Sequence, residues 1–244
     1  MVAIGIGGIW AGGDLFHVLV AAICGLMVWE LVRMLAPDTP RLALQLGGIA
    51  AVAVLIATYL PTLYAMPLLA AAVLVGLGQV KRMMPVYLAF SGLVLLAGWG
   101  MAHVRDDLGF GWMVWLVLVV LVTDVAGYFA GRIIGGPKFW PAVSPKKTWA
   151  GTAAGWLAAA LVGLAFGVGS TGLGALVFAS VLLSFASQLG DIAESAIKRK
   201  VGVKDSSHLI PGHGGLLDRF DGMLGAALAL LVLEYGFGFP WSAL

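Results

Sequence analysis

Long apolar stretches alternate with short polar connections along the whole chain, and eight of the stretches are 15 to 22 residues long. A run of about 20 mostly apolar residues can cross a bilayer as a helix. The predicted spans are Leu15–Leu35, Leu42–Leu60, Leu63–Gln79, Pro85–Trp99, Phe110–Gly131, Trp149–Gly169, Leu173–Gly190 and Phe220–Phe239. The pattern therefore predicts an all-α fold, a polytopic membrane bundle of about eight transmembrane helices.

We expect residues 1–244 to form one integral membrane domain, with N-terminal helices over 1–109 and C-terminal helices over 110–244. Met1–Gly13 is apolar and glycine-rich but too short to span, so we expect the remnant of a further helix or an interfacial segment there. The N-terminus lacks the basic region of a cleavable signal, and Leu15–Leu35 is long enough to stay in the membrane. Retained spans then direct the protein to the membrane.

Composition supports this interpretation. Hydrophobic residues make up 61% of the chain and charged residues 11%, whereas about 25% of a soluble domain is charged. The mean hydropathy is +1.02, so a soluble core of this size could not bury the apolar surface. The single cysteine, Cys24, lies in an apolar run and excludes both a disulfide framework and a cysteine-rich metal site.

The net charge of +2 is too small to indicate a nucleic-acid partner, but the basic residues are unevenly distributed. When the eight spans alternate in direction, 13 of the 14 lysines and arginines fall on one side and only Arg105 falls on the other. The 13 are Arg33, Arg41, Lys81, Arg82, Arg132, Lys138, Lys146, Lys147, Lys198, Arg199, Lys200, Lys204 and Arg219. The positive-inside rule therefore predicts that this side faces the cytosol.

Glycines recur at four-residue spacing within the predicted span Trp149–Gly169, at Gly151 and Gly155 and again at Gly163 and Gly167. Such spacing is typical of closely packed membrane helices, although glycine is frequent in these helices in any case. We find no long-range internal repeat, which weighs against a transporter built from inverted halves. The sequence also contains no stretch that would form a soluble domain.

The most polar stretch runs from Asp191 to Asp221 and holds five acidic and five basic residues. If the preceding helix continues, Asp191, Glu194, Ser195 and Lys198 share one face, because they recur at positions i, i+3, i+4 and i+7. Two interpretations stay open at this point. Either the charges pair with one another and cap helices, or they hold a metal and a phosphate substrate.

The second interpretation has a chemical basis. Asp218 and Asp221 are three residues apart at the start of the last span, so they too share a helical face. Carboxylates at two helix ends suit Mg²⁺, which binds one or two carboxylates together with substrate phosphates. The interleaved lysines and arginines would contact anions, as transfer of a nucleotidyl group requires.

The residues from Ser195 to Asp221 read S-A-I-K-R-K-V-G-V-K-D-S-S-H-L-I-P-G-H-G-G-L-L-D-R-F-D. This run resembles the signature of the phosphatidate cytidylyltransferase (CDP-diglyceride synthase) family, S-x-x-K-R-x-x-x-x-K-D followed by P-x-H-G-G-x-x-D-R-x-D. Every fixed position of the pattern is present, so a chance match is negligible.

The resemblance extends upstream over the C-terminal half. Residues 124–132 resemble the family's D-x-x-A-Y-x-x-G-R, and residues 144–151 resemble S-P-K-K-T-x-E-G. Two positions depart from these patterns: Ala150 replaces the usual glutamate, and Gly127 stands where alanine is commoner. The first departure puts in question any need for that glutamate, and the N-terminal half resembles the family only in hydropathy.

The resemblance implies transfer of the cytidylyl group of CTP to phosphatidate, with Mg²⁺ as cofactor and loops 132–148 and 191–221 as the catalytic loops. The implied metal ligands are Asp191 and Asp218, with Asp221 close by. The implied catalytic residues are Asp191, Ser195, Lys198, Arg199, Lys204, Asp218, Arg219 and Asp221. The implied substrate-binding residues are Asp124, Arg132, Ser144, Lys146, Lys147, Thr148, His213, Gly214 and Gly215.

Several of these positions have an alternative interpretation. The basic loop 132–148 binds substrate phosphate, sets the topology by attraction to anionic headgroups, or does both. Asp124 lies near the end of its span, where a carboxylate is costly unless it has a partner or a function. We expect His213, between glycines, to shape a close backbone approach rather than to transfer protons. We expect only an interfacial role for Asp14, His17, Glu30, His103, Asp106, Asp107 and Glu234.

The expected partners are CTP, phosphatidate and membrane lipids, without nucleic acid, and a homodimer is left open. The expected location is a bacterial inner (plasma) membrane, with the active site facing the cytosol. One competing function is a CDP-alcohol phosphotransferase, whose pattern D-G-x-x-A-R … G-x-x-x-D-x-x-x-D is absent from the chain. Another is a transporter, which would carry ionisable residues near mid-span rather than at the helix ends.

Overall fold

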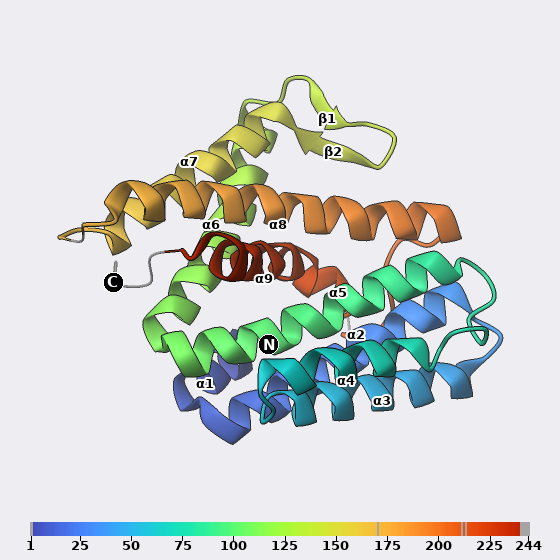
Figure 1. The fold of residues 1–244 in the computed structure, drawn as a ribbon. Helices are drawn as coiled ribbons and strands as arrows, with labels where there is room; N and C mark the ends of the chain where they lie inside the picture. Colours follow the sequence, from blue (N-terminus) through green and yellow to red (C-terminus); the bar gives the residue numbers. More distant parts are fainter. Residues whose placement is uncertain (1, 170, 211, 213, 240–244) are drawn as a thin grey trace. The chain divides into compact units, whose positions relative to one another are not determined.

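A computed structural model describes residues 2–169, 171–210, 212 and 214–239. These residues form α-helices joined by short connections and a single two-stranded hairpin (Figure 1). The predicted all-α class is therefore confirmed. The chain packs as two compact units, an N-terminal unit of Met1–Phe110 with Ile197–Phe220 and a C-terminal unit of Gly111–Ala196 with Asp221–Leu244. Segment 197–220 belongs to the N-terminal unit, so the two units do not coincide with the expected division at residue 109. That division stays a prediction.

The N-terminal unit is built around a layer of neighbouring helices (Figure 1). Its elements are α1 (Val2–Ala11), α2 (Gly13–Leu35), α3 (Pro40–Ala57), α4 (Thr62–Leu74), α5 (Met84–His103) and the π-helical turn η1 (Val104–Leu108). Helix α2 packs against α3 and α5, while α4 packs against α3 and α5. At the α2–α3 contact, a Cβ on Gly25 would lie 2.7 Å from the carbonyl oxygen of Gly47, so the backbones approach this closely only without side chains there.

Residues 1–13, which we expected to form a helical remnant or an interfacial segment, contain helix α1. The Nε of Arg105 donates a hydrogen bond of 2.6 Å to the carbonyl oxygen of Ile9, near the C-terminal end of α1. This carbonyl has no acceptor role inside the helix, because the last four carbonyls of any α-helix lack an intrahelical donor. Arg105, the one basic residue on the other predicted side, therefore has a structural role.

Helix α4 is shorter than the predicted span Leu63–Gln79, whereas α5 and α8 (Leu173–Val201) are longer than predicted. Helix α4 covers 13 residues, and turns continue the chain through residues 75–79. Gly78 has a φ of 77°, and a Cβ on Gly76 would overlap the phenol ring of Tyr87. The Tyr87 hydroxyl instead donates to the carbonyl oxygen of Val73, at 3.1 Å, near the helix end. The helix thus ends earlier than hydropathy predicts, and the ring of Tyr87 packs against the turns that follow it.

The C-terminal unit contains α6 (Phe110–Ile133), β1 (Lys138–Trp140), β2 (Ser144–Thr148) and α7 (Trp149–Phe166), together with most of α8 (Leu173–Val201) and α9 (Leu217–Phe237). Polar contacts join α6 to α8 within the apolar interior. The Nε1 of Trp115 donates to the Oγ of Ser180 at 3.0 Å, and the Oγ1 of Thr123 contacts the Oγ of Ser184 at 2.7 Å. In a helix bundle such bonds satisfy polar groups that have no water to bind.

The glycines at four-residue spacing in α7 lie at helix contacts. A Cβ on Gly151 would lie 2.5 Å from the carbonyl oxygen of Gly127 on α6, and a Cβ on Gly163 would lie 2.7 Å from the Oγ of Ser180 on α8. The packing interpretation of this spacing is therefore confirmed for these positions. Gly127, where the family resemblance leads one to expect alanine, belongs to the closest of these contacts.

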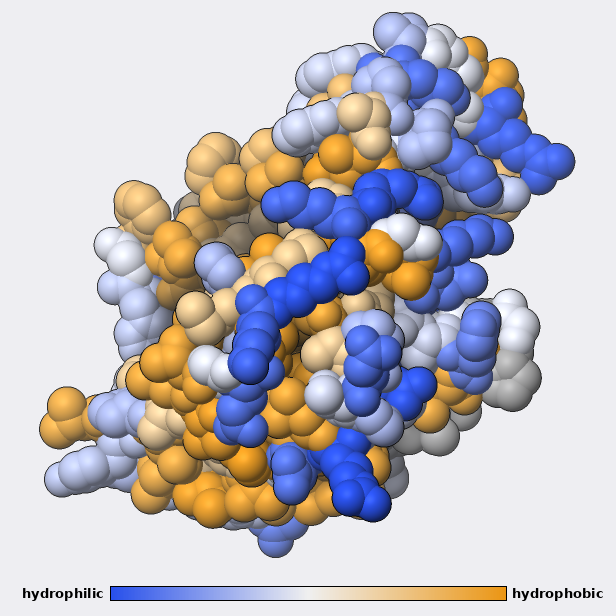
Figure 2. Space-filling model, turned by 90° about the vertical axis from the view of Figure 1, so that its right-hand side faces the viewer, coloured by the Kyte–Doolittle hydropathy of each residue, from blue (hydrophilic) through white to orange (hydrophobic). Residues whose placement is uncertain are grey.

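Seven helices of the described chain are long and apolar enough to cross a membrane. They are Gly13–Leu35, Pro40–Ala57, Met84–Leu108, Phe110–Ile133, Trp149–Phe166, Leu173–Val201 and Leu217–Phe237, and Thr62–Leu74 is a shorter apolar helix. Many of their large apolar side chains are exposed, among them Leu157 at 69% and Phe178 at 65%. Figure 2 shows wide hydrophobic areas of this kind on one face, beside groups of hydrophilic residues. Such a surface is suited to lipid.

Candidate functional site

Helices α8 and α9 cross at very short distance within the C-terminal unit, and glycines make this possible. A Cβ on Gly190 would lie 2.2 Å from the carbonyl oxygen of Asp221, and a Cβ on Gly225 would lie 2.1 Å from that of Ala186. No side chain can occupy such a space, so only glycine permits this crossing. The crossing brings the acidic end of the α8 span next to the first turns of α9.

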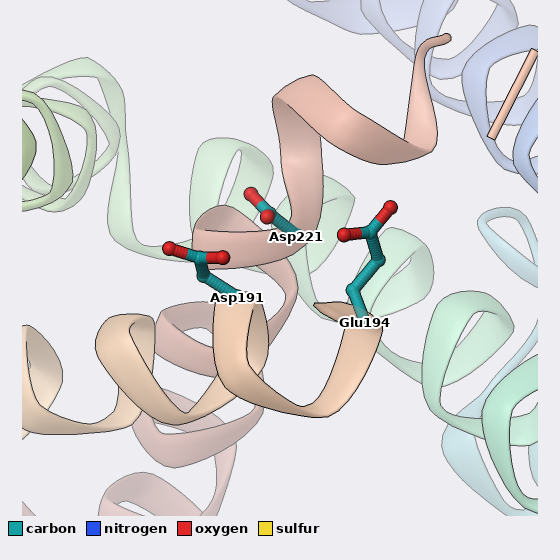
Figure 3. Close-up of side chains that lie close together, drawn as sticks. All are labelled: Asp191, Glu194 and Asp221. Atoms are coloured by element: carbon teal, nitrogen blue, oxygen red, sulfur yellow. The ribbon is translucent and has the colours of Figure 1, made fainter. Parts of the chain in front are cut away.

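Three carboxylates gather at this crossing. Asp191 and Glu194 lie on α8 and Asp221 on α9, as Figure 3 shows, and one oxygen from each lies within 4.8 Å of the others. Glu194 is fully buried, whereas the aspartates are half-buried. Grouped carboxylate oxygens are the donors that Mg²⁺ and similar hard cations bind. The donor set therefore fits a divalent metal.

A cavity of about 440 Å³ opens beside this acidic group, within the same unit. Its walls come from α6, the β-hairpin, α7 and α8. They are formed by Thr123, Asp124, Gly127, Tyr128, Gly131, Arg132, Lys146, Lys147, Thr148, Gly151, Thr152, Gln188 and Asp191. The lining combines three cationic side chains with hydroxyl and amide groups, which is a suitable environment for an anionic ligand.

The β-hairpin positions the lysines of this cavity. Strands β1 and β2 pair antiparallel, with Lys138 opposite Thr148 and Trp140 opposite Ser144. Thr148 ends the hairpin and caps α7, because its Oγ1 accepts a hydrogen bond of 3.1 Å from the backbone nitrogen of Gly151. The predicted loop 132–148 is thus an ordered hairpin anchored to a helix N-terminus.

Lys147 connects the hairpin to helix α8. Its Nζ lies 2.6 Å from the Oδ2 of Asp191 and donates to the carbonyl oxygen of Gln188 at 3.2 Å. The Oγ of Ser195 donates to the other carboxylate oxygen, Oδ1 of Asp191, at 3.2 Å. Asp191 thus contacts both the cavity and the acidic group, as a residue that binds substrate and metal together would.

A second polar cluster lies in the N-terminal unit, around Asp218. The Nζ of Lys198 donates to its Oδ1 at 2.6 Å. Its Oδ2 accepts from the backbone nitrogens of Ser206 and Gly215, both at 2.8 Å, and lies 2.9 Å from the Oγ of Ser206. Asp218 was predicted with Asp191 as a metal ligand, and that assignment stays a prediction. The contacts described here instead join it to Lys198 and to Ser206 and Gly215. The described residues from Ser206 to Leu217 are called the signature loop below.

Two glycines of the signature leave room for carboxylates. A Cβ on Gly214 would lie 2.8 Å from the Oδ2 of Asp218, and Gly214 has a φ of 81°. A Cβ on Gly215 would lie 2.5 Å from the Oε1 of Glu30. The glycine pair is therefore required by close packing against two acidic side chains. His213, predicted to shape a close backbone approach here, lies outside the described residues.

The remaining predicted residues are arranged more loosely. Arg132 is exposed at the cavity, and its Nη1 donates to the hydroxyl of Tyr128 at 3.0 Å. Arg199, Lys204 and Arg219 are exposed in the N-terminal unit. Their role in binding phosphate stays a prediction.

Three residues with a clear place in these clusters were not among the predicted site residues. Glu194 is the third member of the acidic group, and its position three residues after Asp191 was the available signal. Gln188 lines the cavity, where its Oε1 accepts from the Nε1 of Trp156 at 3.1 Å. Glu30 was expected only to reach the interface, yet it is fully buried. Nothing in the local sequence indicates its partners, which are more than 170 residues away.

The sequence of this chain is similar to those of known cytidylyltransferases. The sequence model of the cytidylyltransferase family matches residues 1–235. A phosphatidate cytidylyltransferase of Brucella suis is 44% identical over 156 residues, which cover 63% of this chain and 56% of that protein. One from Helicobacter pylori is 42% identical over 134 residues, covering 54% and 50%. One from Mycobacterium bovis is 38% identical over 154 residues, covering 59% and 50%. The chain spans about half the length of the curated relatives it matches.

Proposed function

Because the chain belongs to the cytidylyltransferase family, we propose that it transfers the cytidylyl group of CTP to phosphatidate and releases pyrophosphate. The product is CDP-diacylglycerol, a precursor in phospholipid biosynthesis. The relatives named phosphatidate cytidylyltransferase support this substrate pair. One structural observation carries the proposal: Lys147 pairs with Asp191 where a cation-lined cavity meets three grouped carboxylates.

We propose Asp191, Glu194 and Asp221 as the residues that would hold Mg²⁺. Their oxygens are grouped, and carboxylates are the ligands that this cation prefers. When bound, the cation would neutralise negative charge on phosphate oxygens. Asp218 stays a predicted ligand on the family signature, and its contacts with Lys198, Ser206 and Gly215 also suit it to orienting Lys198.

The chemistry needs charge neutralisation and alignment more than proton transfer. A phosphate oxygen of phosphatidate is anionic at neutral pH, so it can attack the α-phosphorus of CTP without a general base. A new phosphorus–oxygen bond forms, the bond from the α-phosphorus to the bridging oxygen breaks, and pyrophosphate leaves with the electron pair. Lys146, Lys147 and Arg132 would contact phosphate oxygens in the cavity. For Lys198 and Arg199 the proposal rests on the family signature alone, in which they would offset phosphate charge.

We propose that the basic connections face the cytosol, where CTP is available, and that the membrane is a bacterial inner membrane. The 13-to-1 distribution of basic residues supports this orientation. Seven helices are long enough to span. The hairpin and the connection from α8 to α9 would then lie on the same side as the soluble substrate.

The decisive experiment measures CTP incorporation into lipid by the purified protein, with and without Mg²⁺. We expect Mg²⁺-dependent CDP-diacylglycerol and one pyrophosphate per lipid product, with no labelled enzyme when phosphatidate is omitted. Covalent CMP on the protein would contradict direct attack. Release of CMP from CDP-diacylglycerol with an alcohol would indicate a CDP-alcohol phosphotransferase instead, and substrate uptake into vesicles without lipid product would indicate a transporter.

A further inference from the structure

Glu30 is a fully buried carboxylate on α2 that contacts the signature loop within the N-terminal unit. Its Oε1 accepts hydrogen bonds from the Oγ of Ser207, at 2.6 Å, and from the backbone nitrogen of Leu216, at 2.9 Å. Its Oε2 accepts from the backbone nitrogen of Leu217, at 2.7 Å, and lies 3.1 Å from the Oγ of Ser206. The carboxylate thus meets four donors, all from the signature loop.

These contacts satisfy backbone N–H donors at the start of helix α9, which begins at Leu217. The first backbone N–H groups of a helix have no intrahelical acceptor, and a polar side chain just before the helix usually accepts from them. Here the preceding residue is Leu216, which has no acceptor in its side chain. Glu30 supplies the acceptor from a distant helix, and its negative charge also suits the positive end of the helix dipole.

Glu30 and Asp218 are linked through one hydroxyl group. The Oγ of Ser206 lies 3.1 Å from Glu30 and 2.9 Å from Asp218, and its single proton can bond only one of them at a time. Asp218 in turn holds the ammonium of Lys198 at 2.6 Å. A continuous set of contacts therefore runs from Glu30 through the loop to a proposed catalytic lysine.

We propose that Glu30 is a positioning residue of the cytidylyltransferase reaction: it fixes Ser206, Ser207 and the start of α9 so that Asp218 presents Lys198. This inference rests on the proposed function. The isosteric change Glu30→Gln tests it, because an amide nitrogen cannot accept from the N–H donors it would face. A displacement of about 1 Å in a catalytic group can cost up to about 100-fold in rate.

For Glu30→Gln we expect kcat to fall about 10- to 100-fold with little change in the KM for CTP, because Glu30 lies outside the proposed CTP-binding cavity and would act through Lys198. Glu30→Asp, which keeps the charge on a shorter side chain, should recover part of the rate. Amide hydrogen exchange at Leu216 and Leu217 should become faster in Glu30→Gln. The matched variant Glu234→Gln, on α9 in the C-terminal unit, should change neither the rate nor this exchange.

Ser207→Ala provides a milder test should Glu30→Gln fail to fold, because Ser207 is only half-buried and donates to the same carboxylate. We expect a smaller fall in kcat, again without a change in KM. If the wild-type protein is active and Glu30→Gln is fully active, the positioning role is wrong but the proposed function stands. If Glu30→Gln does not fold, full activity of Ser207→Ala leads to the same conclusion. If the wild-type protein makes no CDP-lipid, the proposed function itself fails, and the positioning role falls with it.

Discussion

The Nζ of Lys147 lies 2.6 Å from the Oδ2 of Asp191, and this ion pair joins the β-hairpin to helix α8. The two side chains are only partly exposed, at 23% and 36%, and both line the cavity. A pair in this position can separate when an anionic substrate arrives, because the lysine can then bind phosphate while the carboxylate binds a cation. Four predictions follow from this arrangement and from the contacts around it.

Removal of the Asp191 carboxylate should abolish activity. For Asp191→Ala we expect the rate of CDP-diacylglycerol formation to fall about 100-fold or more, because a member of the acidic group and the partner of Lys147 are lost together. The measurement is turnover as a function of Mg²⁺ concentration, with membrane insertion checked separately. Glu234→Ala is the control and should keep nearly the wild-type rate. Wild-type turnover of Asp191→Ala at low Mg²⁺ would refute the assignment.

The crossing of α8 and α9 should depend on glycine. We expect Gly225→Ala to lower the stability by about 1–3 kcal/mol and to reduce activity, since its Cβ would overlap the carbonyl oxygen of Ala186. The matched control is Gly174→Ala on α8, where a Cβ meets no atom within 4 Å. Thermal unfolding in detergent and turnover should separate the two variants. Equal stability and activity of both would contradict the predicted role of this crossing.

Lys198 should be replaceable only in part by arginine. Its Nζ pairs with Asp218 in a nearly buried position, with side-chain exposures of 12% and 9%. Lys198→Ala removes the cation and leaves Asp218 without this partner, so we expect a strong fall in kcat. Lys198→Arg restores the charge, but a planar guanidinium does not match the geometry of a compact ammonium. Kinetics of both variants test this, and full activity of Lys198→Ala would disprove the role.

The basic connections should be inaccessible from outside the cell. Single cysteines at Lys138 and Lys200, introduced into a Cys24→Ala background, should not react with a membrane-impermeant reagent applied to intact cells. A cysteine at Asp107, whose side chain is 64% exposed on the opposite predicted side, serves as the positive control. Labelling of both cytosolic positions from outside, with the control behaving as expected, would reverse the proposed orientation.

Much of the fold was predictable because hydropathy acts locally. Each predicted span corresponds to a helix, since burial of a run of apolar side chains in lipid depends on that run alone. The lengths differ for some helices: α4 ends before its predicted span does, next to turns against which Tyr87 packs, and α8 continues beyond its span to Val201. The hydropathy of a segment does not indicate which distant residues pack against its ends, so it does not fix where a helix begins or ends.

The candidate site was predictable as a set of residues but not as an arrangement. The motif indicated Asp191, Asp218 and Asp221 together, whereas the structure groups Asp191 and Asp221 with Glu194 and ties Asp218 to Lys198. Residues three apart on a helix share a face, but their partners depend on what packs against each turn.

The sequence by itself determined that this is a helical membrane protein with a signature rich in Asp, Lys and Gly, because composition and short spacing carry that information. Only the tertiary structure decided that Glu30 caps α9 and that glycines bring α8 against α9. Both depend on contacts between segments far apart in the chain, such as the 187 positions that separate Glu30 from Leu217. Such contacts are selected by packing and by the need to satisfy buried polar groups, and no local pattern records either one.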